Sequence, residues 1–173
     1  MSTKQAEGAA PPGSSGLAVI PARGGSKRIP RKNIKPFRGS PLIAYSIKAA
    51  LASALFARVI VSTDDEEIAA VARGYGAEVP FMREAALADD YTGTLEVTQD
   101  AWRRLAAQGF RADFVACIYA TAPLLTADYL RRAYARFVAS GAAHLYGCCE
   151  FPFPIQRARY LDEHGRATPV QPE

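Results

Sequence analysis

Short apolar runs alternate along this chain with longer segments whose apolar residues recur at helical spacing. The runs predict strands over residues 17–22, 58–63, 79–82, 114–120 and 143–151. The segments between them predict helices that begin near residues 40 and 64, and helices over residues 94–107 and 127–138. This order predicts an α/β fold with right-handed crossovers and a mostly parallel sheet that has helices on both faces.

Residues with known preferences for helix ends support these boundaries. Ser40 and Pro41 suit an N-cap and the first helical position of the first helix. Residues 64–67 are all acidic and would favour the dipole at the start of the second helix. Thr126 is the expected cap of the last helix, and Gly109 follows the end of the third.

The first predicted strand leads into a loop over residues 23–33, here called the basic loop. It carries five cationic side chains, at Arg23, Lys27, Arg28, Arg31 and Lys32. Residues 8–63 contain nine Lys and Arg and no Asp or Glu, so this segment is +9 in a chain whose net charge is only +4. Ligands of parallel α/β sheets bind beyond the carboxyl ends of the strands, so the basic loop predicts a site for nucleotide phosphates.

Glycine and arginine give this loop its phosphate chemistry. The backbone N–H groups of Gly24, Gly25 and Ser26 could turn inward around phosphate oxygens, with Arg23 and Lys27 adding charge. The alternative is a basic surface turn between a strand and a helix. The loop matches neither the dinucleotide fingerprint nor the Gly-Lys-Thr/Ser phosphate loop, which counts against a dehydrogenase and a P-loop NTPase.

Length and composition limit the class of protein. A chain of 173 residues that is 49% hydrophobic and 22% charged predicts one globular domain. Residues 1–16 read as a disordered tail, and the domain as residues 17–173. Without a long apolar run we expect a cytoplasmic protein with no membrane partner. The three cysteines are expected to be reduced, buried thiols that bind no metal.

Two further features concern partners and chain length. The sequence pI of about 9.1 would suit a protein that binds nucleic acid. However, the positive charge is concentrated in one loop, and no basic residues alternate with aromatic ones around Trp102. We therefore expect no nucleic-acid partner. Residues 166–173 are mostly polar, and their pattern predicts no closing strand. We expect that the last part of the protein is absent from this chain.

The residues Pro21–Lys27 and Lys32–Asn33 closely resemble the signature of the CMP-sialic acid synthetase (acylneuraminate cytidylyltransferase) family. The resemblance covers almost all of residues 17–173, and includes residues 59–64, 76–81 and 87–90. It implies a Rossmann-like, three-layer nucleotide-diphospho-sugar transferase fold. Residues 119–123 and 151–157 are most similar to the branch that acts on pseudaminic acid; Tyr119 and Ala120 replace a glutamine-containing pattern of the sialic acid enzymes.

The resemblance assigns roles to residues of the basic loop. CTP would lie over this loop, with Arg23, Lys27 and Lys32 as its catalytic cations: Arg23 and Lys27 would hold the phosphates, and Lys32 would neutralise charge near the phosphorus under attack. Other nucleotide-binding positions are Ala22, Gly24, Gly25, Ser26, Asn33 and Asp90. The Asn33 amide suits the ribose or the cytosine edge. Residues 87–90 would help enclose the nucleoside; the alternative is that their acids are only solvated.

Recognition of the sugar acid is implied for three residues. Thr121 ends the predicted central strand and would face the cleft, and Gln156 lies where relatives place a polar group. Arg157 would pair with the substrate carboxylate, or else be an exposed arginine.

The implied reaction is attack of the anomeric hydroxyl of a nonulosonic acid on the α-phosphorus of CTP. Its products are pyrophosphate and a CMP-sugar, which would be used to make surface glycans. In the family Mg²⁺ is held by an Asp-x-Asp motif near the C-terminus, which this chain lacks; the ligands are expected in the absent part. The family usually forms homodimers. Three alternatives stay open: a non-catalytic nucleotide-binding remnant, a nucleic-acid-binding module, and a CMP-sialic or legionaminic acid synthetase.

Overall fold

A computed structural model of the chain describes residues 15–89, 91–150 and 158–169. The chain divides into two compact units, and the boundary lies between Ala142 and Ala143. The first unit contains a three-stranded sheet and four α-helices, and the second contains a short hairpin.

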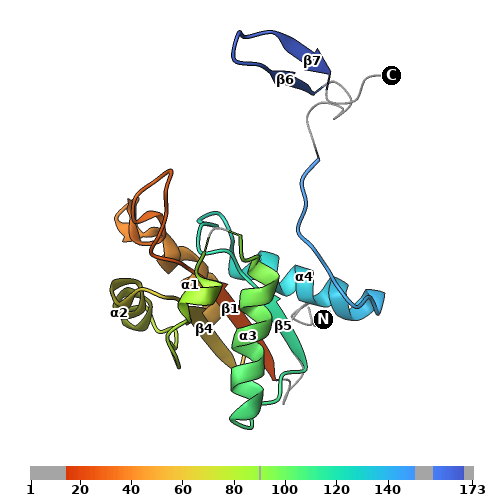
Figure 1. The fold of residues 1–173 in the computed structure, drawn as a ribbon. Coiled ribbons are helices and arrows are strands. Elements are labelled where there is room, and N and C mark those ends of the chain that lie inside the picture. Colours follow the sequence, from red (N-terminus) through yellow and green to blue (C-terminus); the bar gives the residue numbers. More distant parts are fainter. Residues whose placement is uncertain (1–14, 90, 151–157, 170–173) are drawn as a thin grey trace. The chain divides into compact units, whose positions relative to one another are not determined.

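The sheet of the first unit is parallel and has the order β4-β1-β5 (Figure 1). Its strands are β1 (Gly16–Pro21), β4 (Arg58–Ser62) and β5 (Phe114–Cys117). β1 lies in the centre, so its residues are paired on both sides, and Leu17, Ala18, Val19 and Ile20 are all fully buried. The expected α/β fold with a mostly parallel sheet is confirmed.

Helices cover both faces of the sheet, as predicted. Figure 1 shows α3 (Thr94–Ala107) in front of β1, where Ala101 and Leu105 pack with Leu17, Val19 and Ile60. The residues that alternate with these along the strands face the opposite layer. There they pack against α1 (Leu42–Ser53), α2 (Glu66–Gly74) and α4 (Ala127–Ser140). Burying each large aliphatic side chain in these layers stabilises the fold by about 1.5–3 kcal/mol.

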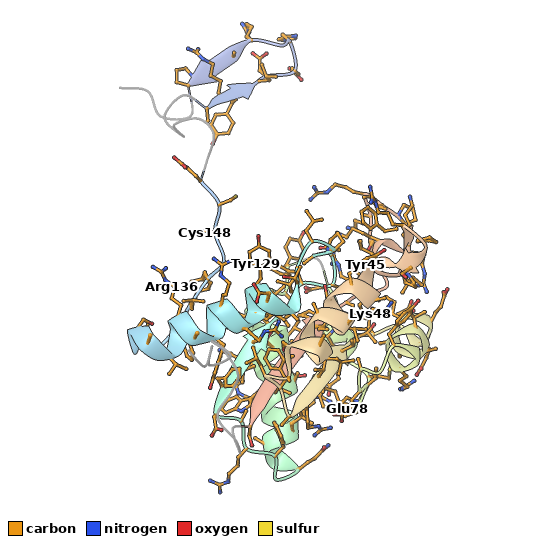
Figure 2. The ribbon with its side chains drawn as sticks, turned by 180° about the vertical axis from the view of Figure 1, so that it is seen from behind. Tyr45, Lys48, Glu78, Tyr129, Arg136 and Cys148 are labelled. Atoms are coloured by element: carbon orange, nitrogen blue, oxygen red, sulfur yellow. The ribbon has the colours of Figure 1, made fainter. Side chains whose placement is uncertain are left out.

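The first helix starts differently from the prediction. Ser40 is not its N-cap, because Ser40–Pro41 forms β3, which pairs with β2 (Pro36–Phe37) in a two-stranded hairpin. Pro41 takes the N-cap position of α1 without a capping side chain. The Tyr45 hydroxyl of α1 donates to the Phe37 carbonyl at 2.6 Å, so the hairpin is fastened to the helix. Figure 2, seen from behind, shows Tyr45 and Lys48 on this helix in front of the sheet.

Other helix ends agree with the sequence. Asp65 caps α2 by accepting a hydrogen bond from the Ile68 N–H, and Thr126 caps α4 by accepting from Tyr129 N–H. Gly76 and Gly109 follow α2 and α3 with φ angles of 91° and 89°, a conformation that glycine adopts without steric cost.

Three predicted strands need correction. Residues 79–82 form no strand: a single bridge joins Ile60 to Glu78, and Pro80 has no N–H with which to continue the pairing. β5 ends at Cys117 rather than residue 120, although Ile118 N–H still donates to the Val19 carbonyl. Residues 143–150, the described part of the fifth predicted strand, contain no strand.

The cysteines are exposed, which corrects the prediction of buried thiols. Cys117 pairs with Val19 in the register of the sheet and so lies on the α3 face. β5 is an edge of the described sheet, and the α3 residues of the buried core pack on β1 and β4, which leaves the outer β5 positions Val115 and Cys117 open to solvent.

The second unit contains a hairpin of β6 (Arg159–Leu161) and β7 (Ala167–Pro169). Its turn is closed by Asp162, whose carboxylate accepts hydrogen bonds from the N–H groups of Arg166 and His164. These bonds, together with one from the Arg166 side chain, lower the pKa of Asp162. No helix within residues 15–89, 91–150 and 158–169 combines the length and apolar character needed to cross a bilayer.

Candidate nucleotide-binding site

The basic loop starts at the carboxyl end of β1 and finishes in a short 3-10 helix, η1 (Lys32–Ile34). Asn33 is the buried residue of η1, with 6% of its surface exposed. Its Nδ2 donates to the main-chain carbonyl of Arg23 at 2.9 Å. The amide that sequence reasoning assigned to the ribose or cytosine therefore joins the two ends of the loop.

The glycine turn differs from the predicted ring of three inward N–H groups. Gly24 N–H donates to the Asp64 carboxylate at 3.1 Å, and Ser26 N–H donates to the Gly24 carbonyl at 2.9 Å. Of the three N–H groups, only that of Gly25 makes no bond among the described residues. Ala22 is buried, and its N–H is also used, by the Ser62 carbonyl at 3.0 Å.

Asp64 joins this turn to a buried arginine that sequence reasoning missed. The same Oδ1 atom that accepts from Gly24 also accepts from Arg83 Nη2 at 3.3 Å. The Arg83 side chain is only 4% exposed, and its Nε has no hydrogen-bond partner among the described residues. Burial lowers the pKa of this guanidinium. One signal was available: Arg83 is the only Lys or Arg between Arg73 and Arg103.

Arg31 is held by carboxylates of the segment that begins α2. Its guanidinium donates two hydrogen bonds to the Asp65 carboxylate and a third to Glu67. The hydrogen bonds with Asp65 raise the pKa of Arg31 and lower the pKa of Asp65. Asp65 and Glu67, which were predicted to favour the helix dipole, therefore also hold the basic loop. They lie more than thirty residues after Arg31 in the sequence.

Arg23 links the loop to the segment before α3. Its Nη1 donates to the Asp89 carbonyl at 2.7 Å. The Asp89 carboxylate accepts from the N–H groups of Tyr91 and Thr92, and its bonds to Thr92 lower the pKa of Asp89. Asp89 thus shapes a turn, and its carbonyl contacts the basic loop through Arg23.

The other site residues predicted from the sequence differ in exposure, and some of them lie outside the described residues. Lys27 is exposed and Lys32 half-buried, both on the basic loop. Thr121 follows β5, whose carboxyl end lies at the same edge of the sheet as that of β1, and is exposed. Asp90, Gln156 and Arg157 lie outside the described residues.

The described residues contain no ready-made metal cluster, although Mg²⁺ needs only one or two carboxylates besides phosphate oxygens. No three His, Cys, Asp or Glu side chains in this part of the chain lie close enough to hold a metal ion together. The carboxylates of Asp64, Asp65 and Glu67 contact the basic loop, and they are occupied by the N–H groups and guanidinium groups described above.

The site therefore combines three candidate phosphate-binding cations, Arg23, Lys27 and Lys32, with an acidic support. This support consists of the loop-contacting carboxylates of Asp64, Asp65 and Glu67. Its geometry suits recognition of a polyphosphate at the edge of a parallel sheet. A family model for cytidylyltransferases matches residues 17–150. The chain belongs to the cytidylyltransferase family.

Individual relatives agree with this assignment. The chain is 52% identical over 150 residues to a pseudaminic acid cytidylyltransferase of Campylobacter jejuni, covering 87% of this chain and 65% of the relative. It is 41% identical over 117 residues to a CMP-N,N'-diacetyllegionaminic acid synthase of Legionella pneumophila, covering 68% of this chain and 50% of that protein. The chain thus spans half to about two thirds of the length of these two relatives.

A solved structure of a CMP-sugar synthetase has a similar fold. It is a CMP:2-keto-3-deoxy-manno-octonic acid synthetase complexed with CTP, matched with a TM-score of 0.60 and 25% identity over 75% of this chain and 49% of that one. This chain thus shares the fold of a protein whose structure was solved with CTP bound.

Proposed function

We propose that this cytidylyltransferase transfers CMP from CTP to a nonulosonic acid, and that this acid is pseudaminic acid. The observation that carries the proposal is the basic loop at the carboxyl end of β1, with Arg23, Lys27 and Lys32 on it. The family match and the 52% identity to a pseudaminic acid cytidylyltransferase support it. Cations in this position neutralise a triphosphate and the charge that develops on its oxygens during transfer.

In the proposed reaction the anomeric oxygen of the sugar acid bonds to the α-phosphorus of CTP. The bond from that phosphorus to the bridging oxygen breaks, pyrophosphate leaves, and the hydroxyl proton passes to solvent. Arg23 and Lys27 hold the phosphates, and Lys32 stabilises the reacting one. The other nucleotide-binding positions in this proposal are Ala22, Gly24, Gly25, Ser26, Asn33 and Asp90, with the glycine turn at the phosphates and Asn33 at the ribose or the cytosine.

The described donors limit how the glycine turn contributes. The N–H groups of Gly24 and Ser26 donate to acceptors inside the protein. In this proposal the turn therefore binds phosphate through its cationic side chains and the Gly25 N–H. Arginine offers a planar two-pronged contact and lysine a mobile point charge, so the two kinds of cation suit binding and transfer respectively.

For recognition of the sugar acid we propose Thr121, Gln156 and Arg157, with Arg157 as the partner of its carboxylate. Arg157→Ala is then expected to raise the concentration of sugar acid required, with CTP affinity unchanged. Enzymes of this kind are generally dependent on a divalent metal, for which we propose Mg²⁺. We also propose a homodimer in the cytoplasm, where CTP is made.

The test is pyrophosphate release by the full chain from CTP and Mg²⁺, with pseudaminic, sialic and 3-deoxy-octulosonic acids offered separately. Release with pseudaminic acid alone supports both the reaction and the branch. Release with only one of the other acids identifies that acid, instead of pseudaminic acid, as the substrate. Silence with all three, together with measurable CTP binding, contradicts the transfer reaction and leaves a nucleotide-binding protein.

A further inference from the structure

One carboxylate, that of Asp65, contacts three separate segments around the candidate site. It receives two hydrogen bonds from Arg31, and one at 2.9 Å from the Ile68 N–H at the start of α2. It also lies against Gly24: a methyl group on Gly24 would come within 2.6 Å of Asp65 Oδ2. Asp65 therefore touches both ends of the basic loop and the helix behind it.

Arg31 controls the backbone that carries Lys32. It has φ 54° and ψ 30°, a left-handed conformation that residues other than glycine seldom adopt. This residue is the N-cap of η1, and its carbonyl accepts from the Ile34 N–H at 3.0 Å. The direction in which Lys32 and Asn33 leave the turn thus depends on how Arg31 is held.

Capping of α2 alone does not account for a carboxylate here. Asparagine and serine cap helices about as well as aspartate, because the cap needs only one accepting oxygen. The two-pronged contact with a guanidinium needs both carboxylate oxygens and their charge. The Arg31 contact and the cap are therefore separable by substitution.

We propose that Asp65 is a positioning residue, which acts through Arg31 to fix the backbone of residues 31–33 and so to aim Lys32. Its effect on turnover rests on the proposed function; its effect on the loop does not. Asp65 touches no phosphate in this arrangement, and the cation that it holds is directed toward α2.

The first experiment measures amide hydrogen exchange in the loop, which needs no ligand. In Asp65→Asn the cap is kept and the charge is lost, so exchange over residues 24–34 is expected to rise at least tenfold while that of β1 and α2 stays unchanged. Arg31→Met is the second variant, made on a partly exposed side chain. The double variant is expected to exchange no faster than the more affected single variant, because each removes the same contact.

Glu66→Gln is the matched control, because it removes the same charge from the same helix turn at an exposed side chain. Wild-type exchange in both Asp65→Asn and Arg31→Met overturns the proposal, as does additive behaviour of the double variant. A rise that spreads through α2 also overturns it, since that pattern means loss of the cap.

The second experiment separates turnover from binding. With the substrates named above, Asp65→Asn is expected to lower kcat at least tenfold and to change the KM for CTP less than threefold; a change confined to KM contradicts the aiming of Lys32. If the wild-type protein neither binds CTP nor releases pyrophosphate, the proposed function fails, and the exchange experiment still decides the role of Asp65 in the loop.

Discussion

The Asn33 side-chain amide donates to the Arg23 carbonyl at 2.9 Å, so the two ends of the basic loop are held by one hydrogen bond. Asn33 is buried, and a carbonyl that loses its partner in such a place costs free energy. The loop is thus closed by its own side chain before any ligand arrives.

Asn33→Ala is expected to destabilise the protein by about 1–3 kcal/mol, because the Arg23 carbonyl loses its donor. The free energy of unfolding from urea titration is the measurement. Lys35→Ala, at an exposed position two residues on, is the control and is expected to change little. Equal effects of the two substitutions contradict a specific role for the hydrogen bond.

The two glycines of the turn are expected to differ. In Gly24→Ala the new methyl would lie 2.6 Å from Asp65 Oδ2, a carboxylate already fixed by Arg31 and Ile68, so the contact must shift. Gly25→Ala meets nothing within 4 Å. We expect a lower Tm for Gly24→Ala and a nearly unchanged one for Gly25→Ala by differential scanning calorimetry. The reverse order would contradict this packing.

The stabilisation by Asp65 depends on pH. Hydrogen bonds from Arg31 hold the pKa of Asp65 below its ordinary value, so the folded state releases this proton more readily than the unfolded state. The contribution is therefore complete above the unfolded value, about pH 4, and is lost as pH falls through the lower folded value. The Tm difference between wild type and Asp65→Asn should be constant from about pH 7 to 5 and shrink below about pH 4. A difference that persists in acid would mean that the charge is irrelevant.

Asp64 and Arg83 are expected to respond unequally to removal. Asp64→Ala leaves a buried guanidinium without its carboxylate and is expected to cost about 3 kcal/mol or more. Arg83→Met removes a cation whose Nε has no partner among the described residues, and leaves Asp64 with the Gly24 N–H, at a cost of about 1 kcal/mol. Chemical denaturation of both variants measures the difference; equal costs would show that Asp64 does not compensate the buried charge.

The proposed phosphate contacts predict a kinetic loss without loss of fold. Arg23→Ala and Lys32→Ala are each expected to lower kcat/KM for CTP at least tenfold, about 1.4 kcal/mol, with the Tm nearly unchanged. Arg28→Ala is the control, because Arg28 is an exposed cation of the same loop with no assigned role. Unchanged kinetics in both test variants would refute the phosphate assignment.

The layered fold and the position of the basic loop were predictable because they follow from hydrophobic periodicity and charge along the chain. The strand predicted over residues 79–82 was wrong because Pro80 removes a pairing donor from an apolar run. Cys117 was predicted to be buried from its apolar neighbours, whereas its exposure follows from the place of β5 at the edge of the described sheet.

The acidic support of the site was not predictable in the same way. A row of acids at residues 64–67 is fully consistent with a helix dipole, and nothing local in the sequence pairs Asp65 with Arg31. The burial of Arg83 likewise depends on packing between segments that are distant in the chain. These contacts join residues that follow β4 to the loop that follows β1, its neighbour in the sheet.

That order has a consequence during synthesis. Residues 8–63 leave the ribosome with nine cations and no acid of their own, and the acids that hold Gly24 and Arg31 follow β4 in the chain. The nascent loop is therefore an unneutralised polycation until Asp65 has emerged. A polycation of this kind is attracted to polyanions such as RNA, and the contacts from Asp64 and Asp65 cannot form before these residues are made.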